Sequence, residues 1–152
     1  MSQKRSQARK HAVQAIYQWQ MAGQDVSDIA NQFLEEQDLS SFEFPYFQDL
    51  LQGVPKHIGQ LDELLKPSLD RAIESVDPVE RAILRIGAYE LQHKIEVPYR
   101  VVINEAVEMA KVFGAEQGHK FVNGVLDQVA KKVRSVEIAG KGKAKTKTKA
   151  RD

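Results

Sequence analysis

The chain has 152 residues, 42% of them hydrophobic, and no cysteine, so it can bury a core as one domain or two small halves, and disulfides and zinc–thiolate sites are excluded. No apolar run approaches the roughly 20 residues that span a membrane, and the first ten residues contain no apolar segment typical of a secretory signal. These features favour a cytoplasmic protein without membrane contact.

The net charge of +1 conceals an uneven distribution of charge along the chain. Lysine and arginine exceed aspartate and glutamate by four in residues 1–10, by two in residues 111–138 and by five in residues 139–152, whereas residues 11–110 carry a net charge of −10. Such a chain is expected to bind polyanions locally, with its basic ends, and not with its whole surface.

Apolar residues recur at helical spacing through the first half of the chain. The spacing over residues 12–19 predicts a first helix, and Ser27 is placed to cap a second, short one. The longest apolar stripe runs over residues 47–65. Pro55 lies within it and lacks an amide donor, so we expect a kink or break near Gly53.

The second half begins with the clearest helix signal in the chain. Asp77 can cap, Pro78 suits the first helical position, and Glu80 completes a capping box. The helix behind them, about residues 78–95, is apolar around much of its circumference and is expected to be central and buried. Two further amphipathic helices follow, and a short apolar stripe over 69–76 suggests one more helix before this one.

No segment shows the alternation or the two-residue turns that predict strands. The fold class is therefore all-α, with about seven helices that divide near residues 74–78. Residues 139–152 are rich in lysine and contain nothing to bury, so we expect a disordered tail.

Metal and nucleotide chemistry lack their usual motifs. None of the four histidines forms a pair at helical spacing, and the glycine–lysine run at 140–143 lacks the strand and helix of a phosphate-binding loop. We therefore expect no metal, no cofactor and no small-molecule substrate.

Two carboxylates fall where the helical pattern predicts burial or partial burial, Glu90 and Glu105. Buried carboxylates can be catalytic, but buried charge also requires a partner, and Arg81, Arg85 or Arg100 could supply it. We favour the structural interpretation. No serine, cysteine or lysine stands beside a base in a recognisable nucleophile motif, so the sequence does not predict an enzyme.

The basic N-terminus is a candidate RNA-binding segment. It carries Lys4, Arg5, Arg9 and Lys10, and because Arg5 and Arg9 are four residues apart they share one helix face. This face continues along the helix into Ala12 and Ile16, so we expect the cationic patch to lie just beyond the edge of the core. Guanidinium groups grip phosphate and stack on unpaired bases, and single-stranded RNA offers both. A frayed, solvated terminus is the alternative, and the four charges alone do not decide between the two.

A second candidate patch surrounds the corner between the last two predicted helices. It combines Lys111, His119, Lys120 and Asn123 with nearby aromatic residues, and of these Phe121 is expected to be at least partly core. Cations and amides at such a corner suit contact with RNA.

Several motifs in order resemble those of the NusB family. They are ERAILRIGAYEL at residues 80–91, INEA at 103–106 and FVNGVLD at 121–127, and the likeness extends over roughly residues 5–134. The resemblance implies two stacked small helical bundles, about residues 1–75 and about 76–138, followed by the tail from 139.

The resemblance also implies a function. Members of the family bind the boxA element of nascent RNA together with NusE, which is ribosomal protein S10, and join an antitermination complex on RNA polymerase, notably on ribosomal RNA operons. It places Arg5 and Arg9 in the RNA-binding segment, and Tyr17, Glu74 and Glu80 on the surface that faces NusE. An acidic surface suits a basic ribosomal protein.

Three positions depart from the pattern of the family. The N-terminal segment of the family is richer in arginine, whereas this chain has Ser6 and Gln7 between Arg5 and Arg9. Gln117 stands where the family often has an acidic residue, in the loop before His119. Two other interpretations stay open: an RNA-binding appendage like the one fused to ribosomal RNA cytosine methyltransferases, and a purely structural helical partner protein. The catalytic half of a methyltransferase is not visible in this sequence.

Overall fold

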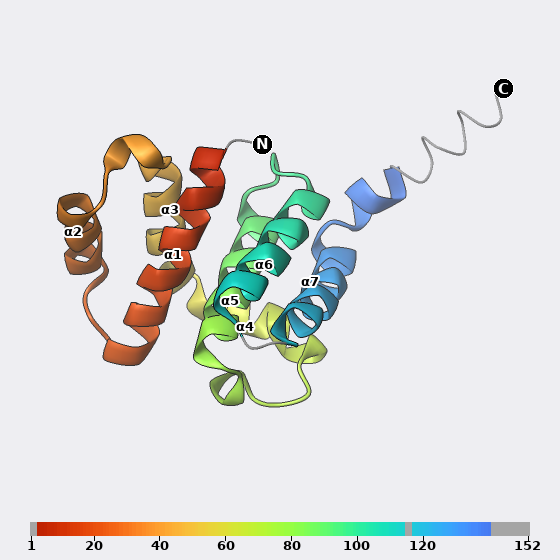
Figure 1. Cartoon of the computed structure of the whole chain (residues 1–152). Helices are drawn as coiled ribbons and strands as arrows, with labels where there is room; N and C mark the ends of the chain where they lie inside the picture. Colours follow the sequence, from red (N-terminus) through yellow and green to blue (C-terminus); the bar gives the residue numbers. More distant parts are fainter. Residues whose placement is uncertain (1–2, 115–116, 141–152) are drawn as a thin grey trace, which may run out of the picture.

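The structure is a computed structural model that describes residues 3–114 and 117–140. Within these ranges the chain is helical and contains no strand (Figure 1), so the predicted all-α fold of about seven helices is confirmed. The α-helices are α1 (Gln3–Ala22), α2 (Val26–Glu36), α3 (Phe44–Lys56), α4 (Ile58–Leu65), α5 (Pro78–His93), α6 (Tyr99–Phe113) and α7 (Gly118–Val133). Three 3-10 helices, η1 (Leu39–Ser41), η2 (Lys66–Ser68) and η3 (Ile73–Ser75), lie between them.

The ends of the first helices depart from the prediction for local reasons. The cap of α2 is Asp25 and not Ser27, because the Asp25 carboxylate accepts a hydrogen bond from the Ser27 amide at 2.8 Å. The break in the long apolar stripe falls at His57, between α3 and α4. Pro55 is the penultimate residue of α3, so the donor that it lacks disturbs only the last turn, and the helix runs past Gly53.

The prediction of a helix over residues 69–76 is wrong. That stretch contains only η3, and η2 precedes it. A few apolar residues beside Pro67 provide too little packing to offset the cost of nucleating an α-helix.

The N-cap and the first residue of α5 match the prediction. The Asp77 carboxylate accepts hydrogen bonds from the amides of Val79 and Glu80, both at 3.1 Å, and Pro78 is the first helical residue. All residues from 82 to 91 are buried. On one side of the helix, a Cβ at Gly87 would stand 2.7 Å from the Leu126 side chain, so the absence of that carbon lets α7 pack closely on α5.

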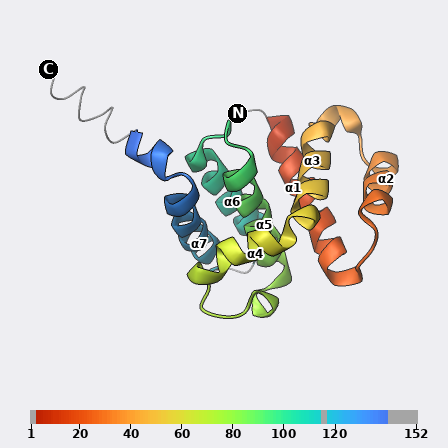
Figure 2. The same ribbon diagram turned by 180° about the vertical axis from the view of Figure 1, so that it is seen from behind.

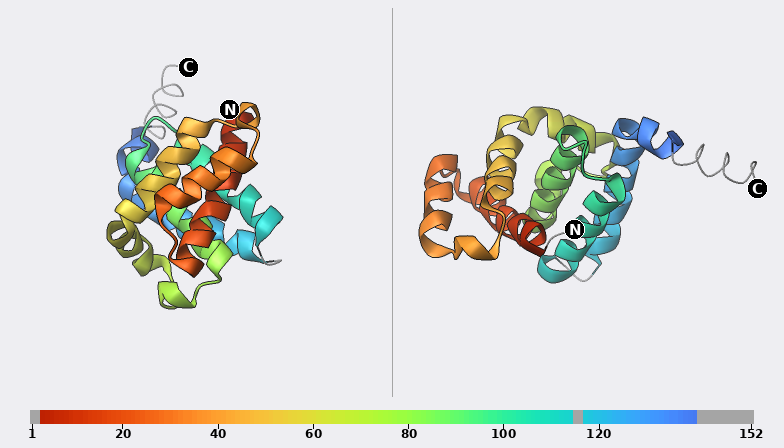
Figure 3. Two further views of the ribbon diagram at one scale, coloured as in Figure 1. Left: turned by 90° about the vertical axis from the view of Figure 1, so that its left-hand side faces the viewer. Right: turned by 90° about the horizontal axis from the view of Figure 1, so that it is seen from above.

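Helix α5 joins the two ends of the molecule. It packs against α1 and α3 on one side and against α4, α6 and α7 on the other. Figure 1 shows α2 at the outer edge, next to α1 and α3, and Figure 2, from behind, shows α4 crossing in front of α5. The two further views in Figure 3 show the same arrangement. The division into two bundles near residue 75 stays a proposal, because the central helix belongs to the packing of both.

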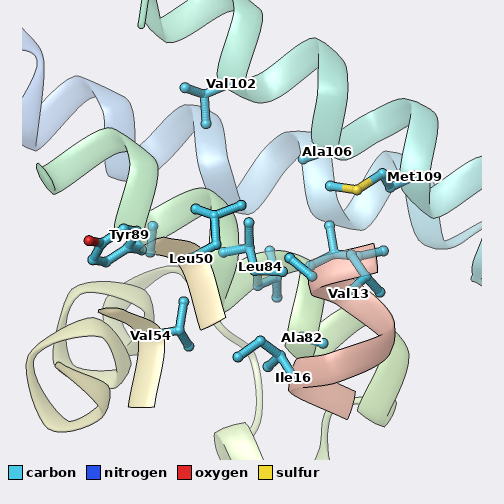
Figure 4. Close-up of a cluster of buried hydrophobic side chains, with 14 of the residues drawn as sticks. Val13, Ile16, Leu50, Val54, Ala82, Leu84, Tyr89, Val102, Ala106 and Met109 are labelled. Atoms are coloured by element: carbon cyan, nitrogen blue, oxygen red, sulfur yellow. The ribbon is translucent and has the colours of Figure 1, made fainter. Parts of the chain in front are cut away.

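One continuous apolar core runs through these helices. In Figure 4, Val13 and Ile16 of α1 face Leu84 of α5, while Ala106 and Met109 of α6 lie above them. The helical residues 135–140 follow α7, so positions 139 and 140, expected in the disordered tail, are helical. The rest of that predicted tail, 141–152, lies outside the described residues.

Candidate nucleic-acid interface

Arg9 lies inside the protein and not on its surface. Its side chain is 0% exposed. Its Nε donates to Glu90 Oε1 at 2.9 Å and its Nη2 to Glu90 Oε2 at 2.8 Å, and its Nη1 donates to Glu105 Oε1 at 2.8 Å. The prediction of an exposed face shared by Arg5 and Arg9 is therefore wrong. Arg9 is flanked on α1 by the buried Ala8 and Ala12, so the helix directs it toward the core.

Glu90 is the centre of a polar cluster that we call the Glu90 cluster, formed by the buried Arg9, Glu90 and Tyr46 and the half-buried Glu105 and Ser6. The Tyr46 hydroxyl donates to Glu90 Oε2 at 2.5 Å, and the Ser6 hydroxyl bonds to Glu105. Burial, together with the Glu90 charge, raises the pKa of the Tyr46 phenol far above its ordinary value, so this group stays a donor. The structural interpretation of Glu90 and Glu105 is thus supported, but their partner is Arg9, which was not among the three arginines considered.

Arg5 is partly exposed and already paired. Its side chain is 28% exposed, its Nε donates to Glu43 at 2.7 Å, and its guanidinium lies 4.2 Å from the centre of the Tyr46 ring. The hydrogen bond from Arg5 lowers the pKa of the Glu43 carboxyl. Lys4 is exposed and Lys10 half-buried. RNA at this end would meet Lys4 directly, and would compete with Glu43 for Arg5.

The second patch is accessible. Lys111 stands exposed in the last turn of α6, 3.6 Å from Glu108. Lys120 and Asn123 are exposed on the first two turns of α7, where spacing of three places them on one face, and His119 is half-buried. We call these four residues, Lys111, His119, Lys120 and Asn123, the α6–α7 corner.

Phe121 and Gln117 complete the surroundings of the corner. Phe121 is half-buried and packs against the core, as expected, and the Arg71 guanidinium lies 5.5 Å from its ring centre. Gln117 is exposed and precedes α7 directly. The two preceding residues lie outside the described ranges.

The N-terminal segment and the α6–α7 corner belong to helices that lie side by side. Ser6 and Arg9 of α1 both bond to Glu105 of α6, and α6 packs along α7. Figure 1 shows α1, α6 and α7 along the near side of the molecule. The two basic segments nevertheless lie apart, because the end of α6 packs near Val13 and Tyr17 in the middle and second half of α1, whereas Lys4 and Arg5 belong to its first turn, at the opposite end of the molecule in Figure 1.

The three predicted partner residues differ in accessibility. Tyr17 is half-buried and lines a shallow groove of about 260 Å³ with Val13, Gln14, Val79 and Phe113. Glu74 is exposed beside a larger groove of about 570 Å³ between α4 and the segment before α5. Glu80 is only 8% exposed. Its placement on a partner surface is corrected, because the start of α7 covers it: a Cβ at Gly118 would stand 2.5 Å from its Oε2.

Arg134 is a further buried cation that the sequence analysis missed. Its guanidinium donates to the carbonyls of Leu91 at 2.8 Å, Val97 at 2.9 Å and Lys94 at 3.0 Å. It thereby satisfies carbonyls at the end of α5, which have no partner within the helix. The available signal was its position one residue after Val133, where the apolar stripe of α7 continues.

In the described part of the chain, no three histidine, aspartate or glutamate side chains gather to hold a metal ion. No helix within the same ranges is both long and apolar enough to span a membrane.

Comparison with known proteins places the chain in a family. The model of the NusB family matches residues 6–131. The transcription antitermination protein NusB of Nitrosococcus oceani is 59% identical over 138 residues, which cover 91% of this chain and 93% of that protein. The protein of the same name from Hahella chejuensis is 51% identical over 147 residues, 97% of each chain.

Comparison with solved structures points to the same family. NusB of T. maritima superposes with a TM-score of 0.75 at 28% identity and covers 87% of this chain and 94% of that one. A NusB chain in a crystal structure of the antitermination factors NusB and NusE with double-stranded RNA gives a TM-score of 0.77 at 28% identity, over 86% of this chain and 98% of that one. On the family match, the identity over nearly full length and the shared fold, this chain belongs to the NusB family.

Proposed function

We propose that the chain is an RNA-binding transcription antitermination factor and an adaptor without catalytic chemistry. In this proposal it binds boxA RNA together with NusE and joins an antitermination complex on RNA polymerase, notably on ribosomal RNA operons. It would act in the cytoplasm, where nascent RNA is made. The single observation that carries the proposal is the exposed α6–α7 corner of a chain that belongs to the NusB family.

The chemistry of that corner suits RNA. Lys111 and Lys120 are exposed ammonium groups that can neutralise phosphate, and the exposed Asn123 amide can donate and accept hydrogen bonds. Lys4, in the first turn of α1, is a separate exposed positive charge. Arg9 has no part in this surface, because its guanidinium is saturated by Glu90 and Glu105.

The protein partner is proposed to dock beside this surface. The groove at Tyr17 is mainly apolar and begins on the same helix, α1, that carries Lys4. Residues 11–55 contain seven acidic and no basic side chains, which favours encounter with a basic protein. The acids are Asp25, Asp28, Glu35, Glu36, Asp38, Glu43 and Asp49.

The methyltransferase-appendage alternative has less support. This chain covers 93% of the Nitrosococcus relative, which leaves no room in that protein for a catalytic domain. That relative is named an antitermination protein.

Titration of labelled boxA RNA against the full chain, with and without NusE, tests the proposal. A scrambled RNA of equal length is the control. We expect boxA to bind more tightly than the scrambled RNA, and NusE to increase the difference. Equal binding of the two RNAs in the presence of NusE would contradict the proposal and favour a purely structural role.

A further inference from the structure

Gly124 is a glycine that the protein's own packing does not explain. It is the seventh residue of the sixteen-residue helix α7 and is exposed. Glycine in a helix interior is destabilising relative to alanine. Its backbone is ordinary helix, since Gly23 is the one described glycine with a positive φ. A Cβ at Gly124 would meet no atom of the described residues within 4 Å.

At three other glycines in the central packing, a neighbouring side chain within the protein leaves no room for a Cβ. A Cβ at Gly87 would stand 2.7 Å from Leu126, and one at Gly118 would stand 2.5 Å from Glu80. At Gly53 the ring of Tyr89 occupies the place of the side chain. Each of these three is required by a neighbour. At Gly124 the space that a side chain would fill is open to the outside.

The surface around this space is polar and cationic. Lys120 and Asn123 lie four residues and one residue before Gly124, and both are exposed. One turn further on, the negative charge of Asp127 is offset by Lys131 at 3.4 Å. The nearby apolar residue Val125 is buried, and Phe121 is half-buried with the Arg71 guanidinium 5.5 Å from its ring centre, so the apolar surface beside the open space is small and has a cation next to it.

We infer that Gly124 is a close-approach position, where the sugar–phosphate backbone of a bound RNA strand passes over α7 without a side chain in between. The inference rests on the proposed function and deepens it. A ligand backbone that comes near a helix needs the room that only glycine leaves. Lys120 is placed to meet a phosphate, and the Asn123 amide to meet a sugar hydroxyl or a base edge.

RNA fits this position better than a protein. The centre of a protein interface is usually depleted of charge and enriched in aromatic residues, whereas Gly124 has a lysine and an amide beside it. Stacked aromatic side chains are not needed for contact with a strand's backbone. Lys120 supplies a cation, Asn123 an amide and Gly124 the open space, and together these suit close contact with a polyanion.

Gly59 provides a matched comparison. It is also exposed, and a Cβ there would meet nothing within 4 Å. It is, however, the second residue of α4, in a first turn where the backbone amides lack helical partners in any case. Its place in the chain therefore requires no RNA contact: it lines the groove beside Glu74, and α4 carries none of the proposed RNA contacts.

The test is the series Gly124→Ala and Gly124→Met in the full chain, with Gly59→Ala as control. Because alanine and methionine are good helix formers, we expect Tm to rise by about 2–4 °C in both Gly124 variants. We expect the Kd for boxA RNA to increase by at least about fivefold with alanine and further with methionine. The salt dependence of binding should stay unchanged, since no charge is removed.

The outcomes separate this inference from the proposed function. If the wild-type chain does not distinguish boxA from scrambled RNA, the proposed function fails first. If it does, and Gly124→Met binds boxA as tightly as the wild type, the close approach is refuted. Weaker binding in Gly59→Ala of the same size would refute it too, as would a loss confined to NusE affinity, which would assign Gly124 to a protein contact.

Discussion

Arg9 and Glu90 lie 81 positions apart in the sequence and form a two-pronged ion pair in the centre of the protein. The two side chains are 0% and 2% exposed. The pair connects α1 to the last turn of α5, and the third nitrogen of the same guanidinium reaches Glu105 on α6. One side chain therefore connects three helices, of which α1 carries Lys4 and α6 carries Lys111.

Arg9→Ala should destabilise the fold strongly. Removing one partner of a buried ion pair leaves the other charge without compensation, which typically costs about 3–5 kcal/mol. Arg5→Ala is the matched control on the same helix. Its partner Glu43 is 38% exposed, and pairs of that kind contribute about 1 kcal/mol or less. Free energies of unfolding from urea titration measure both, and a loss of about 1 kcal/mol or less for Arg9→Ala would contradict the prediction.

The same contrast changes how binding data on this segment should be interpreted. A double variant of Arg5 and Arg9 would lose RNA affinity through partial unfolding, and the loss would resemble a lost contact. Only the Arg5 change, measured with the folded fraction determined, reports on RNA.

The helices could be predicted from the sequence because the signals for them are local. The Asp77-Pro78 start and the wide apolar face of α5 depend on neighbouring residues alone, and both are confirmed. The burial of Arg9 depends on Glu90, which no local pattern connects to it. A charged residue at the end of an amphipathic stripe can be either exposed or buried, and which of the two occurs depends on whether another helix supplies a partner. The sequence correctly predicts Glu80 in the first turn of α5, but the surface that the resemblance implies for it is covered by the start of α7.

His11 should make stability depend on pH. His11 is 7% exposed, and its ring packs edge-on against Phe42, with ring centres 4.5 Å apart. Burial lowers the pKa of His11 below its ordinary value of 6.5. A lowered folded-state pKa means that its contribution is complete above about pH 6.5 and is lost as the pH falls through the folded-state value.

The variant His11→Phe isolates that contribution. Phenylalanine keeps an aromatic ring among its neighbours but does not titrate. Urea titrations at about pH 7.5 and about pH 5.5 should show a smaller drop in unfolding free energy for the variant than for the wild type. His93, whose pKa is lowered by burial and by the charge of His57, contributes in the same direction and accounts for a remaining drop. An identical drop in both proteins would exclude His11 as a source.

Lys120→Gln should weaken RNA binding through charge alone. The side chain is exposed, so the fold should be unaffected. Loss of one phosphate contact should reduce the slope of log affinity against log salt by about 0.7 for a single strand. Lys56→Gln, an exposed lysine at the end of α3, is the control and should leave the slope as it is. Unchanged slopes in both variants would remove the α6–α7 corner from the site.

Truncation after Gly140 should separate general from specific RNA affinity. The removed residues 141–152 carry six basic side chains and one acidic one. Because their composition offers nothing to pack, Tm should not change, while affinity for all RNAs should fall alike. A change in the preference for boxA over a scrambled RNA would show that this segment reads sequence.

Tyr17→Ala should weaken binding of NusE and leave RNA binding by the isolated chain intact. Tyr17 lines the groove that Val79 and Phe113 complete, and an aromatic side chain at the edge of such a groove often anchors a partner. A loss of about 2 kcal/mol, roughly thirtyfold in Kd, is expected by calorimetry. Met21→Ala is the control, since Met21 is 56% exposed on the same helix outside the groove. Equal losses in the two variants would mean that NusE reads α1 generally, and an unchanged Kd in Tyr17→Ala would move the partner surface away from this groove.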